Sequence, residues 1–139
     1  MASPVIRLKR RAEFLRVAAK GRKAPMPGLV LQAFAREDDD PARLGFTVTR
    51  KVGNAVVRNR TRRRLKEAAR LVLRDQAARN EPLRGVDLVL VGREGTRKRD
   101  FRALIDDIGR AIRKTGAQKA GAHQAGIRNM VVPQPGSVR

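Results

Sequence analysis

Arginine and lysine side chains are concentrated between residues 50 and 74, where they could bind an anionic partner. The cations of this segment are Arg50, Lys51, Arg58, Arg60, Arg62, Arg63, Arg64, Lys66, Arg70 and Arg74. The acidic residues are Glu67 and, just beyond the segment, Asp75. A solvated helix normally mixes both signs of charge, and guanidinium groups bind phosphate through paired hydrogen bonds. An anionic polymer is therefore the simplest partner for this segment.

The sequence contains few residues of the types and spacing that catalysis requires. The absence of cysteine excludes disulfides, thiol nucleophiles and cysteine-ligated zinc. The acidic run Asp38-Asp39-Asp40 lies in an expected hairpin turn without a second carboxylate cluster nearby, which favours a solvated turn over a metal site. His123 is the only histidine and lies in an expected C-terminal tail. No nucleophile, base and orienting group come together, so we expect no catalytic residue and no metal site in this chain.

The net charge of +20 over 139 residues indicates a single small domain that binds a polyanion. We expect this domain at residues 1–115 and a basic, disordered tail at 116–139, where Gly, Ala, Gln and Pro recur without a period. The apolar runs are too short to span a bilayer, which favours nucleic acid over a membrane. The charged stretch at residues 7–11 disfavours a secretory signal and predicts a cytoplasmic location.

Hydrophobic periodicity predicts alternating helices and strands. A helix is expected over Ala12–Lys20 with a stop at Gly21, and Asn54 is a suitable N-cap for a long helix over Ala55–Ala78. The apolar stripe of that long helix consists of Leu65, Ala68, Ala69 and Val72. The expected strands are Leu29–Ala35, Leu44–Thr49 and Val86–Val91, with a short edge segment or loop near Pro25, and a last helix spans Phe101 to Ile112.

The run from Lys51 to Arg60, Lys-Val-Gly-Asn-Ala-Val-Val-Arg-Asn-Arg, followed by Arg62 and Arg63, resembles the signature of the bacterial ribonuclease P protein subunit. The order of the flanking elements agrees with that family, and the resemblance covers residues 6 to 114. The chain departs from the pattern at Ala18, Gln32 and Ala69, where many relatives carry aromatic side chains, and it has no Tyr or Trp.

The resemblance implies a small α/β sandwich in the order αβββαβα, with a four-stranded sheet and a left-handed crossover at the long helix. The order of helices and strands alone would predict the common right-handed crossover. The resemblance also implies two RNA-binding surfaces. The surface for the catalytic RNA subunit would comprise Gly53, Asn54, Arg58, Asn59, Arg60, Arg62, Arg63 and Lys66. The surface for the single-stranded 5′ leader of precursor tRNA would comprise Phe14, Lys20, Val30, Gln32, Thr47, Thr49, Arg50 and Lys51.

Two of these residues have structural roles that the sequence leaves open. Phe14 could pack in the core instead of contacting the leader, and Gly53 could serve the tight turn before the helix. Because aromatic side chains are few, we expect leader binding to rely more on charge than on stacking.

By the same resemblance, the chain is the protein subunit of an endoribonuclease whose RNA subunit, with bound Mg²⁺, removes the leader. The implied partners are that catalytic RNA and precursor tRNA, without a membrane, an obligate protein partner or a cofactor on the protein. The alternative is a small basic ribosomal or RNA-chaperone protein. A DNA-binding module ranks third because no helix-turn-helix spacing precedes the long helix.

Overall fold

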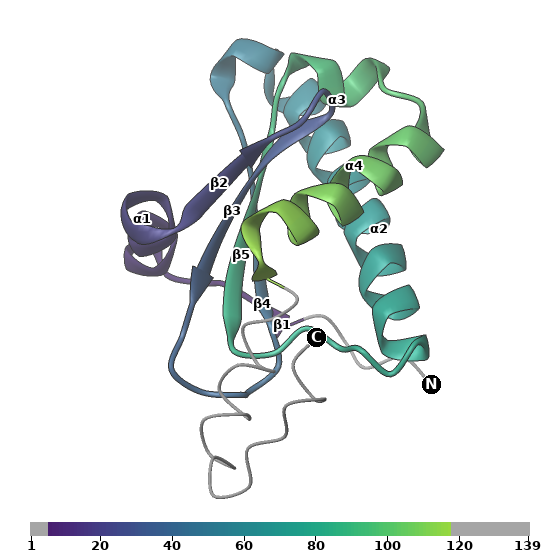
Figure 1. Ribbon diagram of the computed structural model, residues 1–139. Helices are drawn as coiled ribbons and strands as arrows, with labels where there is room; N and C mark the ends of the chain where they lie inside the picture. Colours follow the sequence, from purple (N-terminus) through teal and green to yellow (C-terminus); the bar gives the residue numbers. More distant parts are fainter. Residues whose placement is uncertain (1–5, 118–139) are drawn as a thin grey trace, which may run out of the picture.

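The computed structural model describes residues 6–117. The elements are β1 (Ile6–Arg7), α1 (Arg11–Lys20), β2 (Arg22–Pro25), β3 (Leu29–Ala35), β4 (Arg43–Val48), the 3-10 helix η1 (Arg50–Val52), α2 (Ala55–Ala78), β5 (Val86–Gly92), α3 (Glu94–Lys98) and α4 (Phe101–Thr115). Figure 1 shows one sheet with α1 against one face and α2 and α4 against the other. This arrangement confirms the predicted α/β sandwich.

The strands form one sheet in the order β1-β4-β5-β3-β2. β5 pairs in parallel with β4 and antiparallel with β3, so it lies between these two strands. The turn at residues 36–42 therefore joins strands that are not hydrogen-bonded to each other, and the expected hairpin was wrong. Hydrophobic alternation defines which face of a strand is buried but not which strand is its neighbour.

The sheet has five strands, not the expected four. The additional strand β1 is two residues long and pairs in parallel with β4 at the edge of the sheet. The N–H of Leu8 extends this pairing by donating to the carbonyl of Leu44 at 2.8 Å. Such a short strand leaves no periodic signal in the sequence, and neither does the five-residue helix α3.

Several predicted boundaries agree closely with the structure. Helix α2 begins and ends where the sequence predicts, and α1 begins at Arg11, one residue earlier than expected. β4 is shifted by one residue from its predicted range and ends at Val48. The segment near Pro25, for which we expect a short edge segment or a loop, is the edge strand β2.

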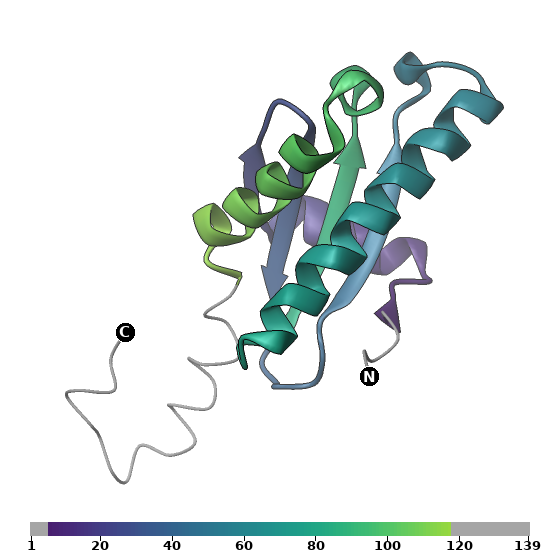
Figure 2. The ribbon, with the colours of Figure 1, turned by 90° about the vertical axis from the view of Figure 1, so that its right-hand side faces the viewer.

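β4, η1, α2 and β5 form a crossover between two adjacent parallel strands. The left-handed crossover that the resemblance implies concerns this connection from β4 through α2 to β5. In Figure 2, α2 lies in front of the sheet and β5 lies to the left of β4. A parallel pair needs a long connection of this kind, because the chain must return to the end of the sheet where the first strand began.

The main core lies between the sheet and the helices α2 and α4. β3 contributes Leu29 and Leu31, and β5 contributes Leu88 and Leu90, all of them nearly inaccessible to solvent. The whole predicted stripe of α2 is buried against them, together with Thr61. Alternate residues of each strand therefore face this core, as the strand period requires. The other residues of β3 and β5 face α1.

A smaller apolar cluster joins α1 to the opposite face of the sheet. Its buried members are Leu8, Val17 and Val89, and the partly buried side chains packed on it include Phe14 and Phe34. The cluster is small because α1 has ten residues and most of its side chains are exposed. This face of the sheet is consequently less completely covered than the α2 face.

None of the helices found between residues 6 and 117 combines the length and apolar character that crossing a bilayer demands.

Candidate nucleic-acid interface

The start of α2 is fixed by Gly53 and Asn54. Gly53 has a φ of +154°, a conformation that side-chain-bearing residues rarely adopt, and a Cβ atom there would lie 2.9 Å from Cγ1 of Val57. The Asn54 side chain caps the helix by accepting a hydrogen bond from the N–H of Val57 at 3.0 Å. Both residues therefore have a structural role. The sequence predicts this role for Asn54, and for Gly53 it leaves the choice between a turn and RNA contact open.

The arginines near the start of α2 fall into two groups. Arg58 donates to the carbonyl of Gly53 at 2.8 Å, and Arg62 donates to the side chain of Asn59 at 2.8 Å. Arg60 and Arg63 are exposed, and within residues 6–117 neither forms a hydrogen bond or an ion pair. Two guanidinium groups in the first turns of this helix thus remain available for phosphate oxygens.

A groove separates α2 from the β1–β4 edge of the sheet. This α2–β4 groove has a volume of about 570 Å³ and is lined by Arg7, Leu44, Phe46, Arg63, Lys66, Glu67, Ala69 and Arg70. Burial, together with the nearby positive charges of Arg7 and Arg62, lowers the pKa of Lys66. The cations around this groove repel one another, so a bound anion would relieve that repulsion.

The α1 face of the sheet brings together the strand residues predicted to contact the leader. Val30 of β3 is aligned with Val91 of β5, which is aligned with Thr47 of β4. Gln32 is aligned in the same way with Val89, one step along the strands. The register therefore places Val30, Gln32 and Thr47 on one face, as predicted, and all are partly exposed.

Phe14 of α1 lies against this face. A Cβ atom at Gly45 would be 2.6 Å from Cζ of Phe14, so the glycine makes room for the ring. The ring packs on the small apolar cluster and remains partly exposed. Phe14 thus combines core packing with an accessible edge, and both alternatives left open by the sequence are compatible with its position.

The predicted cations of the leader surface lie at two borders of this face. Thr49 follows β4 and precedes η1, which contains Arg50 and Lys51, and these three residues are exposed. Lys20 ends α1 immediately before the edge strand β2 and is also exposed. The structure therefore brings together the strand residues and Phe14, while Lys20 lies apart from residues 49–51.

A buried carboxylate fixes α1 to the sheet. Asp87 has a fully buried side chain, and its oxygens accept hydrogen bonds from Arg36 at 2.6 Å, Arg43 at 2.8 Å and Arg16 at 3.2 Å. Burial alone would raise the pKa of Asp87, but the hydrogen bonds from Arg43 and Arg36 outweigh it and hold the pKa below its ordinary value. Arg43 also pairs with Glu13 of α1 at 2.8 Å.

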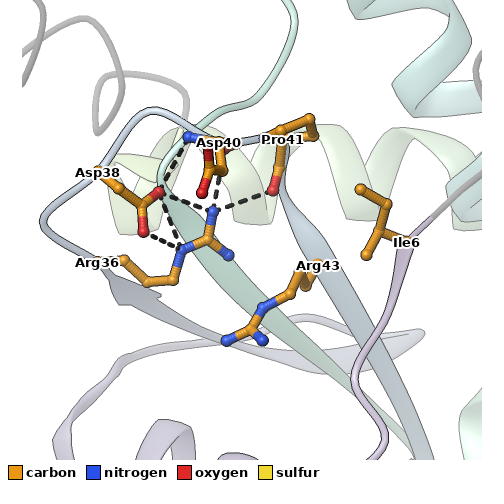
Figure 3. A pocket seen from close by; sticks show the side chains of 6 residues that line it. All are labelled: Ile6, Arg36, Asp38, Asp40, Pro41 and Arg43. Atoms are coloured by element: carbon orange, nitrogen blue, oxygen red, sulfur yellow. Dashed lines mark hydrogen bonds and ion pairs between the residues drawn. The ribbon is translucent and has the colours of Figure 1, made fainter.

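The acidic turn lies beside this cluster, at a cavity of about 400 Å³ shown in Figure 3. The carboxylate of Asp38 accepts hydrogen bonds from Arg36 and from the N–H of Asp40 at 3.0 Å. Arg36 also donates to the carbonyls of Asp40 and Pro41 at 3.0 Å. Over the described residues, no group of three or more acidic or histidine side chains is placed to hold a metal ion. His123 lies outside residues 6–117.

The fold and this surface define a small α/β protein suited to nucleic acid, with cations on a long helix and a partly open sheet face behind it. The chain belongs to the ribonuclease P protein family, whose family model, Ribonuclease P, matches residues 3–116. It is 65% identical over 120 residues to the ribonuclease P protein component of Gluconacetobacter diazotrophicus, covering 86% of this chain and 99% of the relative. The component from Paramagnetospirillum magneticum is 45% identical over 130 residues, covering 90% and 94%.

Solved structures of this family share the fold. The RNase P protein of Staphylococcus aureus superposes with a TM-score of 0.64 at 21% identity, covering 82% of this chain and 98% of that protein. The RNase P protein from Thermotoga maritima gives a TM-score of 0.57 at 27% identity, covering 75% and 92%. The resemblance first seen in the residues around Arg58-Asn59-Arg60 is thereby confirmed at the level of the whole domain.

Sequence reasoning missed several residues of these surfaces. Asp87 was not singled out from the sequence, although a single carboxylate inside an apolar strand is a signal for a buried ion pair. Phe34 was not considered, yet its ring lies under the guanidinium of Arg16 at 5.0 Å. Arg7 and Phe46 were not paired because the short strand β1 that brings them together was not expected.

Proposed function

We propose that this chain is the protein subunit of a ribonuclease P that trims the 5′ leader from precursor tRNA. Helix α2 would dock on the catalytic RNA subunit, and the α1 face of the sheet would hold the single-stranded leader. Family membership supports the enzyme assignment, whereas the roles of the two surfaces rest on their chemistry and on the resemblance of the motif. The alternative, a ribosomal or RNA-chaperone protein, is not favoured by the family match.

The observation that carries the proposal is the separation of the two surfaces by the sheet. Arg60 and Arg63 extend from α2 on one side, where paired hydrogen bonds to phosphate suit a folded RNA. Phe14, Val30 and Thr47 lie on the other side, where an aromatic edge and polar side chains suit an unpaired strand. One small protein can in this way contact the catalytic RNA and the substrate at the same time.

Catalysis in this proposal belongs to the RNA. A water activated by RNA-bound Mg²⁺ would attack the phosphodiester in line and leave a 5′-phosphate on the mature tRNA. The protein would bind the leader, favour precursor over product, and reduce phosphate repulsion where RNA strands crowd. It would hold no cofactor of its own and would act in the cytoplasm, where precursor tRNA is made.

Reconstitution tests this proposal. The full chain is combined with the RNA subunit transcribed from the same genome, and cleavage of a precursor tRNA is followed at low Mg²⁺. We expect accurate release of the 5′ leader at a Mg²⁺ concentration where the RNA alone is inactive. Failure of the protein to bind this RNA, or copurification with ribosomal RNA alone, would contradict the assignment.

A further inference from the structure

The α2–β4 groove has a floor that a simple phosphate-binding surface would not need. Leu44 and Ala69 are almost completely buried beneath it, and the ring of Phe46 is partly exposed within it. Small Ala69 on α2 leaves this space open beside the ring. The groove volume of about 570 Å³ lies within the range of roughly 300–1,000 Å³ typical of small-molecule sites.

Cations surround this apolar floor on both sides. Arg7 comes from β1, and its guanidinium carbon lies 5.9 Å from the centre of the Phe46 ring. Lys66 and Arg63 come from successive turns of α2. Glu67 is the acidic residue of the lining, and it is paired with Arg70 at 2.6 Å. The groove therefore has a surplus of positive charge over an aromatic floor.

We propose that the α2–β4 groove binds one unpaired nucleotide of the RNA that docks on α2, with its base on Phe46 and its phosphate between Arg7 and Lys66. This inference rests on the proposed function, because the same helix supplies both contacts. The proposal adds a base-binding pocket, and therefore one specific anchoring nucleotide, to a surface that is otherwise expected to contact only phosphates.

The chemistry of the groove selects a nucleotide over other anions. A free phosphate would satisfy the cations but would leave Phe46 and the apolar floor in contact with water. A base has a flat apolar face for the ring and carries its own phosphate, and arginine can stack on the base as well. In a regular duplex the bases are already stacked on each other, so the nucleotide must be unpaired.

The test uses Phe46→Leu in the full chain, with the in vitro transcribed RNA subunit as the probe. Leucine keeps the apolar packing but removes the ring, so binding should weaken roughly 5- to 100-fold, with an unchanged salt dependence. Arg7→Gln should weaken binding and lower the log–log salt slope by about 0.7–0.9. Phe101→Leu and Arg102→Gln on α4 are the matched controls and should bind like the wild type.

A second measurement locates the nucleotide. One unpaired base of the RNA should be protected from base-modifying reagents by the wild type and become reactive again with Phe46→Leu. Thermal unfolding confirms that the variant folds, and Phe46→Met provides a second substitution of similar volume.

The outcomes separate this inference from the function on which it rests. If Phe46→Leu and Phe46→Met bind normally while Arg60→Ala weakens binding, the base pocket is overturned but docking through α2 stands. A loss with Arg7→Gln alone would also overturn it, because the groove would then bind only phosphate. If Arg60→Ala has no effect either, the docking role of α2 fails as well.

Discussion

At the scale of single residues, Asp87 is the charge on which the α1 side of the molecule depends. It is fully buried, and removing its charge would leave Arg36, whose side chain is only 10% exposed, without its shortest ion pair. A buried charge that loses its partner costs far more than an exposed one. The arginines proposed to face RNA differ in this respect, since Arg60 and Arg63 are exposed and their removal costs the fold little.

We expect Asp87→Asn to lower the free energy of unfolding at pH 7 by about 3 kcal/mol, because it removes the buried charge that pairs with Arg36 and Arg43. Chemical denaturation of the isolated protein measures this change. Glu37→Gln, in the exposed part of the turn, is the control and should change stability by no more than about 0.5 kcal/mol.

The pH dependence provides an independent check of the same residue. Since the folded-state pKa of Asp87 is lowered, its stabilisation is fully present above the unfolded carboxyl pKa of about 3.9 and is lost as the pH falls through the folded-state value. Wild-type stability should therefore fall more steeply than that of Asp87→Asn below about pH 4. If the free energy of unfolding varied with pH in the same way for both proteins, Asp87 would not be held ionised by its arginines.

At the scale of elements, α2 carries its packing residues and its proposed binding residues on different sides. Its buried residues face β3, β4 and β5, and its exposed side carries the arginines that form no ion pair. Helical geometry separates the two sides, because residues three and four apart share a face. The helix can therefore change its charge without a change in its packing.

We expect the double variant Arg60→Ala, Arg63→Ala to bind the RNA subunit more weakly and with a flatter salt dependence. Each lost phosphate contact should lower the log–log slope by about 0.7–0.9. Binding measured over a series of salt concentrations gives this slope. Arg102→Ala with Arg113→Ala on α4 removes the same charge from another helix, and it should leave the slope closer to the wild-type value. An unchanged slope in the α2 variant would remove this helix from the interface.

At the scale of the whole molecule, the sheet lies between the two proposed surfaces and is packed against helices on both faces. α1 is anchored through Asp87 of β5, and α2 packs on the other face of that strand and its neighbours. The fold thus places the proposed RNA-docking side and the proposed leader side on opposite faces of one sheet. Precursor and mature tRNA differ in the leader, so only the α1 face should distinguish them.

We expect Phe14→Leu, in the reconstituted holoenzyme, to weaken binding of precursor tRNA while leaving mature tRNA unchanged. Loss of one stacked base would correspond to roughly a 5- to 100-fold change in Kd. Phe101→Leu is the matched control, since this partly buried ring packs on the opposite side of the sheet. Stability should fall by only about 1 kcal/mol in either variant. Equal weakening for both tRNAs would assign Phe14 to the core.

The local structure and the class of partner could be predicted from the amino-acid sequence. Gly53, Asn54 and the apolar stripe of α2 give local signals, namely a turn, a cap and a period, and the structure has the helix within the predicted bounds. The excess of arginine and the motif around Arg58 were also sufficient to indicate the RNA-binding family. These properties depend on residues close together in the chain, so a sequence pattern can reveal them.

The contacts between residues far apart in the chain could not be predicted in this way and depend on the tertiary structure. β5 pairs between β3 and β4, and this pairing places Asp87 beside Arg36 and Arg43. The two-residue strand β1 brings Arg7 over Phe46 and so forms one side of the α2–β4 groove. Such contacts follow from strand order and from the close packing of whole layers, and neither has a periodic signature in the sequence.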